Sequence, residues 1–361
     1  MRKIYEKARS FCAVVVVWSI VFLAFSCEQG MDVPENGNGE PCKLILSIIP
    51  QTKATGLNHG IQSEDNIVNK LEIFVFRGDG DDAGYLDTYK KLEGDELISL
   101  SGIEIKSTTG KKIIYAIANS HKDSWEGVVT IEDFEKEMAF LQKEKLKDFT
   151  MVGNVEATLQ LTTSVTFSIS RYVARVHLSS VKTDFAGTPY EGTSLKNVKI
   201  YLVNVYGDKS YAINENSSSS LVLNRRMAVG QDVNNCAMGG LLYDEIVSDI
   251  TDTPYATQHY FYCYENMIES EGDAMGYTRL VIQGDLNGNT YYYPININRE
   301  GFGYSDTNGH YGVKRNTSYK LDVIISRPGS TDPDEILEYG TLTTNLNVLD
   351  WVTVPVVQVQ F

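Results

Sequence analysis

The end of the chain alternates apolar and polar side chains, and this pattern strongly limits how the segment can fold. The apolar positions are Val357, Val359 and Phe361, with Gln358 and Gln360 between them. A period of two is typical of a β-strand that buries one face. Because a chain end frays unless something holds it, this strand must either close its own sheet or pair with another molecule. Adding a strand to an open sheet is an established mode of recognition.

Strand-like segments make up most of the remaining chain. They cover residues 44–49, 70–76, 113–118, 155–161, 165–169, 173–178, 195–206, 255–264, 277–283, 290–297 and 319–325. Asn287-Gly288 separates two of them and favours a tight hairpin turn. Many short strands at this spacing predict a mainly β fold of two tandem β-sandwiches, with a boundary near residue 180.

One helix is expected in the N-terminal domain, over residues 130–149. Its apolar side chains recur at spacings of three and four, as on one face of an α-helix. They are Ile131, Phe134, Met138 and Leu141. Thr130 is the expected N-cap, with Asp133 in the place of the Glu or Gln of a capping box.

The N-terminus has the features of a secretion signal and resembles those of bacterial lipoproteins. Basic residues precede an apolar run over residues 11–25, which is short for a membrane span. Ser26 then precedes Cys27, the position that is lipidated in such signals and becomes the first residue. Ala24 departs from the usual Leu, Val or Ile, and the alternative is an ordinary signal peptide with a chance cysteine.

A polar segment and a strongly apolar strand follow this signal. Residues 28–41 are rich in Gly, Asn and Pro, which predicts a flexible tether. The next segment, residues 44–49, is apolar on both faces, so burial of both faces is expected. One face carries Leu44, Leu46 and Ile48, and the other carries Ile45 and Ile49. Residues 50–56 lack periodicity and are expected to form an exposed loop that proteases can cut.

The composition excludes some classes of partner. The formal net charge is −15, and removal of residues 1–26, with four basic residues and one acidic, lowers it to −18. Such an acidic protein is poorly suited to bind nucleic acid or anionic lipid. Five cysteines do not indicate a disulfide scaffold. Cys236 and Cys263 either pair or remain as two partly buried thiols.

No set of residues points to an enzyme, a metal site or a cofactor. The five His residues are scattered, with none at a metal-binding spacing, and there is no nucleophile elbow or phosphate loop. A calcium loop starting at Asp79 fails, because Ala83 and Lys90 stand where oxygen ligands are needed. Trp351 is either a glycan-stacking residue or, as is more usual among Val and Leu, a core anchor.

Taken together, these motifs resemble the fimbrillins of Bacteroidales, in particular the FimA-type major fimbrial subunit of type V pili. The resemblance rests on Cys27, the apolar strand over residues 44–49 and the loop at Lys53-Ala54. It continues, in the same order, through residues 68–76, 114–119, 149–153, 261–266, 291–295, 314–323, 329–333 and the tail around Trp351.

The resemblance implies two transthyretin-like β-sandwich domains and a proteolytic maturation. The precursor would reach the outer membrane as a lipoprotein, and a surface protease would cut between Lys53 and Ala54. The family more often has Arg before the cut, but a cut at Arg77 would also remove residues 71–76. The implied division is a signal peptide over 1–26, a tether and removable strand over 27–53, and β-sandwiches over 54–180 and 181–361.

The resemblance also implies how such subunits would join. The groove vacated by Leu44, Leu46 and Ile48 would accept residues 348–361 of another subunit. The expected inserting residues are Trp351, Val357, Val359 and Phe361. This describes a non-enzymatic stalk subunit of an adhesive cell-surface fimbrium, with other copies and other fimbrial subunits as partners. The alternatives are a tip or anchor subunit, or a surface glycan-binding lipoprotein.

Overall fold

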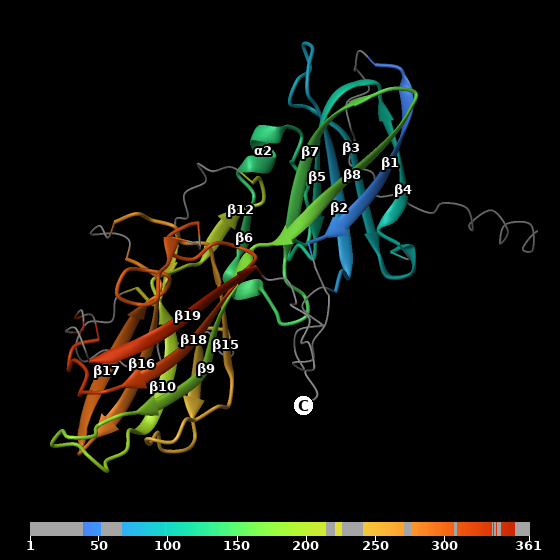
Figure 1. Ribbon diagram of the computed structural model, residues 1–361. Coiled ribbons are helices and arrows are strands. Elements are labelled where there is room, and N and C mark those ends of the chain that lie inside the picture. Colours follow the sequence, from blue (N-terminus) through green and yellow to red (C-terminus); the bar gives the residue numbers. More distant parts are fainter. Residues whose placement is uncertain are drawn as a thin grey trace, which may run out of the picture. The chain divides into compact units, whose positions relative to one another are not determined.

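In the part of the chain that the structure describes, the protein is mainly β, with two tandem β-sandwich domains and one short α-helix (Figure 1). This confirms the predicted fold class. The computed structural model describes residues 39–51, 67–97, 99–213, 221–225, 241–270, 276–306, 309–333, 335, 337 and 341–350.

The N-terminal domain is built from seven strands in the order β3-β2-β5-β7-β8-β1-β4. Their bounds are β1 (Pro41–Pro50), β2 (Lys70–Arg77), β3 (Leu86–Glu93), β4 (Ser101–Thr108), β5 (Gly110–Ala118), β7 (Met151–Leu159) and β8 (Thr162–Arg171). Strands β7 and β8 pair only at Met151↔Arg171 and Val152↔Ser170. The sheet therefore divides at this point, and apolar side chains from both parts form one core cluster.

The C-terminal domain contains two four-stranded sheets. One has the order β15 (His259–Tyr264), β9 (Val173–Thr183), β18 (Thr317–Ile325) and β19 (Leu342–Asp350). The other has the order β14 (Tyr243–Ile246), β10 (Lys196–Val203), β16 (Arg279–Leu286) and β17 (Asn289–Asn296). The predicted hairpin turn joins β16 to β17: Asn287 and Gly288 have φ of 50° and 82°, as a type I′ turn requires.

Two short pairs complete the strands. Strand β11 (Val205–Tyr206) pairs with β13 (Val222–Leu223), and β12 (Asp208–Ser210) pairs with β6 (Met138–Phe140). The second pair joins a segment of the N-terminal half of the chain to the C-terminal half. A 3₁₀ turn, η1 (Gly94–Glu96), follows β3.

The predicted helix is much shorter than its sequence pattern. Helix α2 covers only Ile131–Glu135, and Thr130 with Asp133 forms the expected capping box. The prediction of a helix beyond residue 135 is wrong, because the chain continues as β6 and the 3₁₀ turn η2 (Leu141–Lys143). Pairing of β6 with β12 supplies backbone hydrogen bonds that a continued helix would otherwise provide, and tertiary contacts commonly override helix propensity in this way.

The passage between the domains carries no linker-like sequence. Strand β8 ends at Arg171 and β9 begins at Val173, so by strand pairing the change of sheet occurs at Tyr172. The predicted boundary near residue 180 lies inside β9, which pairs with β15 and β18. Apolar alternation runs through this stretch without Gly or Pro, which explains why the sequence did not mark the change. The predicted domain limits remain predictions.

Candidate functional site: strand β1 and its groove

Strand β1 lies inside its sheet, between β8 and β4 (Figure 1). It pairs in parallel with β8, from Lys43↔Thr162 to Pro50↔Ile169. It pairs antiparallel with β4, from Pro41↔Thr108 to Ser47↔Ser101. A strand with a partner on each side uses both of its hydrogen-bonding edges, so removing β1 would expose two ladders of N–H and C=O groups.

The three predicted displaced-strand residues share one face of β1 and enter the core. Leu44 and Leu46 are fully buried and Ile48 is 4% exposed. On the other face, Ile45 is half-buried and Ile49 is 52% exposed. The expectation that both faces are buried is therefore wrong. Among the described residues, the core lies on one side of β1, and the face that carries Ile49 is not covered by a second layer.

Burial of this apolar face contributes much of the free energy that holds β1 in the sheet. Full burial of an aliphatic side chain contributes about 1.5–3 kcal/mol, so Leu44, Leu46 and Ile48 together contribute roughly 6 kcal/mol. Their neighbours in the core include Ile103 and Ile105 of β4, with other apolar residues of β2, β5 and β8. An incoming strand must offer similar side chains at alternate positions to replace β1 without loss of stability.

Most of the other predicted site residues lie outside the described part of the chain. The structure describes the chain one residue beyond β1, to Gln51, whose backbone N donates to the carbonyl of Ile169 at 2.7 Å. Lys53 and Ala54 lie in the undescribed segment 52–66. The other undescribed site residues are Cys27, Trp351, Val357, Val359 and Phe361. Lipidation, cleavage and strand donation at these residues remain predictions.

Strand β19 limits where a donor segment can begin. It pairs with β18 from Leu342↔Ile325 to Asp350↔Thr317. The first residues of the predicted donor range 348–361 therefore pair within their own domain. A strand offered to another subunit would have to start after Asp350.

Strand β4, one wall around β1, is tied to β3 by side chains. Asp87 of β3 accepts hydrogen bonds from the Ser107 hydroxyl at 2.5 Å and from the backbone N of Thr108 at 2.9 Å. Thr88 Oγ1 and Lys90 Nζ each donate to a backbone carbonyl of β4 at 2.8 Å. These contacts involve no residue of β1, so they can hold β4 whether or not β1 is present.

The Asp87 carboxylate is buried, and its hydrogen bonds and neighbouring positive charges offset the cost of burying its charge. Burial raises its pKa, but hydrogen bonds from Ser107 and Thr108 and the charge of Lys112 outweigh this effect and lower the pKa to about 2. Lys112 Nζ and Arg77 Nε each lie 3.3 Å from a carboxylate oxygen. The ionised carboxylate therefore stabilises the fold.

Asp87→Asn is expected to lower the free energy of unfolding at pH 7 by about 2 kcal/mol, the equivalent of the pKa shift. Because the folded pKa lies below the unfolded value of 3.8, this stabilisation is present above pH 3.8 and is lost as the pH falls towards 2. Urea unfolding at several pH values would measure it. The exposed Asp81→Asn is the control, and equal stability of the two variants would contradict the role of Asp87.

The described cysteines are free. Cys42 and Cys263 are both buried thiols, and burial raises the pKa of Cys263 to about 12. Cys236 lies outside the described residues. A thiol with so high a pKa is mostly protonated at neutral pH and is a poor nucleophile.

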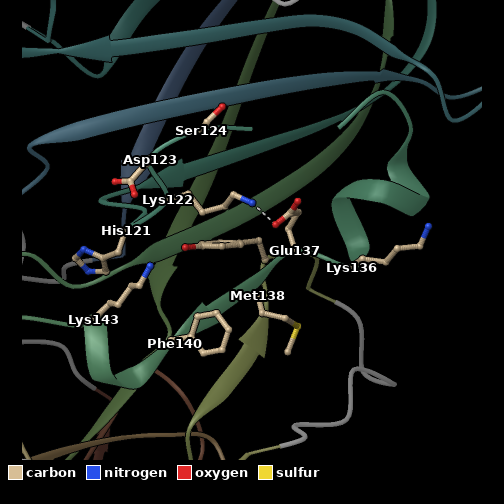
Figure 2. Close-up of a pocket in the computed structure, with 10 residues that line it drawn as sticks. His121, Lys122, Asp123, Ser124, Lys136, Glu137, Met138, Phe140 and Lys143 are labelled. Carbon is tan, nitrogen blue, oxygen red and sulfur yellow. Dashed lines mark hydrogen bonds and ion pairs between the residues drawn. The ribbon is translucent and has the colours of Figure 1, made fainter. Parts of the chain in front are cut away.

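A hollow of about 420 Å³ lies beside helix α2 and β6. Figure 2 shows that Lys122 points towards Glu137 across it, and the two form an ion pair. His121, Lys143 and Asp123 also line it, so its charges are mixed.

Within the described ranges, no group of three or more His, Cys, Asp or Glu residues is placed to hold a metal ion. No described helix is long and apolar enough to cross a membrane.

Comparison with known proteins identifies the class of this protein as the fimbrial subunits of Bacteroidales. Residues 44–217 match the family "Major fimbrial subunit protein (FimA)". Residues 172–358 match the family "Fimbrium tip subunit Fim1C-like, C-terminal domain". The chain belongs to this group of FimA-type fimbrial subunits, which confirms the resemblance inferred from its motifs.

Individual relatives agree with this assignment. The chain is 26% identical over 305 residues to the major fimbrium subunit FimC of Porphyromonas gingivalis, covering 81% of this chain and 59% of that protein. It thus spans somewhat over half the length of that relative.

Two solved structures share the fold. A fimbrilin (FimA) from P. gingivalis W83 has a TM-score of 0.62 at 18% identity, over 87% of this chain and 98% of its own. The tip fimbrial protein Mfa3 from the same species, with a C-terminal truncation, has a TM-score of 0.52 at 14% identity, over 86% and 100%.

Proposed function

We propose that this protein is a non-enzymatic structural subunit of a type V fimbrium and that it polymerises by donor-strand exchange. In this proposal, the C-terminal strand of one subunit replaces β1 of the next. The observation that carries it is the position of β1, which is paired on both edges and buries Leu44, Leu46 and Ile48. The apolar alternation at Val357, Val359 and Phe361 supplies a strand of matching pattern.

Maturation would begin with a precursor lipidated at Cys27 and held at the outer membrane. A surface protease would then cut between Lys53 and Ala54. Since β1 ends at Pro50 and β2 begins at Lys70, a cut there would leave β1 bound by non-covalent contacts alone. Arg77 is a poorer site, because it is only 9% exposed and pairs with Asp87.

Lys53→Ala is expected to block assembly by keeping β1 covalently attached. The protein isolated from cells would then begin at Cys27, with the mass of an added lipid, whereas the mature wild-type protein would begin at Ala54. Mass spectrometry of the isolated protein would identify both termini. Lys145→Ala, which changes an exposed lysine in the described part of the chain, is the control. Normal fimbriae from the Lys53 variant, still starting at Cys27, would contradict the proposed maturation.

The proposed place in the fimbrium is the stalk, because the chain has both a replaceable first strand and an apolar terminal strand. A tip position is the second candidate, favoured by the match of residues 172–358 to the tip-subunit family. Immunogold labelling would separate the two. A stalk subunit would be labelled along the whole fibre, and a tip subunit at one end only. Adhesion would follow from either position at the cell surface.

A further inference from the structure

Strand β8 is the second neighbour of β1, and apart from β1 it has little backbone pairing in its sheet. Its neighbours in the sheet are β1 and β7. It pairs with β1 over eight residue positions but with β7 only at Met151↔Arg171 and Val152↔Ser170. If β1 leaves, the backbone pairing of β8 within its sheet is reduced to these two positions, while Phe167 and Ile169 of β8 still pack in the core. A further contact at the short pairing would help an empty groove to keep its shape.

Arg315, which is distant in the sequence, contacts this short pairing directly. Its Nη2 donates to the carbonyl of Val152 at 3.0 Å and to the carbonyl and hydroxyl of Ser170 at 2.6 Å each. Its Nε donates to the carbonyl of Arg171 at 3.1 Å. Val152 and Ser170 are one of the two residue pairs that join β7 to β8. One guanidinium therefore binds both strands where they meet.

The C-terminal domain holds Arg315 in place for these contacts. Its backbone N donates to Glu265 Oε2 at 3.1 Å, and its guanidinium lies 4.8 Å from the centre of the Tyr172 ring. Arg171 returns a hydrogen bond in the opposite direction, to Asn316 Oδ1 at 2.9 Å. Because its backbone and the face of its guanidinium are already held, the Arg315 side chain loses little conformational entropy when it binds the two strands.

We propose that Arg315 is a positioning residue that keeps β8 in place while the groove is empty, so that an incoming strand of a second copy finds its parallel partner already formed. The benefit to an incoming strand rests on the proposed function, whereas the contacts of Arg315 with β7 and β8 do not depend on it. The chemistry requires arginine, because three carbonyls and a hydroxyl on two strands need a planar group with several donors. The single ammonium of lysine cannot reach them all.

The test is a double-mutant cycle in the intact full-length chain, read by hydrogen exchange of the β8 amides. Arg315→Lys removes one support of β8, and Leu46→Ala weakens the other by loosening β1. If both support β8, the double variant exchanges faster than the product of the single effects, by about tenfold, which is typical coupling for two groups that hold one element. Arg279→Lys is the control. It makes the same change at a buried arginine whose Nε donates to Asn296 of β17, away from β8.

If Arg315 does not support β8 jointly with β1, the exchange rate of the double variant will equal the product of the two single effects. The Arg279 control is expected to behave in this way. The same result for Arg315 would overturn the proposal. Should Arg315→Lys fail to fold, Ser170→Ala removes one acceptor of the guanidinium and is expected to show smaller coupling of the same sign. A separate assay adds a synthetic peptide of residues 351–361 to the chain cut after Lys53. Failure of the wild-type protein to bind it would count against donor-strand exchange, while the exchange cycle would still decide the role of Arg315.

Discussion

Leu46→Ala is expected to destabilise the full-length precursor and at the same time to speed the replacement of β1. Leu46 is fully buried in the core of the N-terminal domain. Truncation of such a leucine costs about 2–5 kcal/mol, from lost transfer free energy and the cavity left behind. Because this loss weakens only the strand that leaves, the barrier to exchange falls as the precursor loses stability. A loss of about 3 kcal/mol corresponds to a rate increase of roughly a hundredfold if release of β1 limits exchange.

Two measurements on the same variant would check this prediction. Denaturant unfolding of the uncut chain gives the loss of stability, and displacement of β1 by a peptide of residues 351–361 gives the exchange rate of the cut chain. Ile49→Ala is the matched control on the same strand, because Ile49 is 52% exposed, and changes at exposed sites are usually within about 0.5 kcal/mol. A destabilised precursor with an unchanged exchange rate would show that β1 is not the strand that is replaced.

Deletion of residues 354–361 is expected to leave a folded subunit that accepts a strand but cannot donate one. These residues follow β19, which already completes its pairing with β18 at Asp350. Polar substitution of Val357 and Val359 is expected to have the same effect, because burial of an unpaired polar group costs roughly 1–3 kcal/mol per site. Mixing the truncated subunit with cut wild-type protein and following polymer length by electron microscopy would measure this loss, since each truncated subunit would end a chain.

The control for the tail is Gln358→Glu, which changes a residue expected to face solvent and should leave polymer length nearly unchanged. Two outcomes would contradict the assignment in different ways. If the truncated monomer unfolds, the tail belongs to the core of its own domain. If it folds and polymerises normally, another segment is the donor.

The sequence predicted the strands best where one face is buried and turns are marked by Gly or Asn. The hairpin at Asn287-Gly288 is an example, since its backbone conformation is one that these residues adopt readily. Strands β3 and β4 were missed, although Ile103 and Ile105 alternate with polar residues in β4. Strand β3 is rich in charged and polar residues, and its fit to the fold depends on Asp87, whose partners come from other strands.

The sequence by itself determined the mainly β class, the apolar face of β1 and the family resemblance, because these depend on local periodicity and on motifs in fixed order. Only the tertiary structure decided that β1 is buried on one face, that β8 and β4 are its neighbours, and that Asp87 and Arg315 hold these neighbours. The physical reason is that such contacts join segments far apart in the chain. Arg315 lies 145 residues from Ser170, and no local pattern records which distant carbonyls a side chain will meet after the strands have paired.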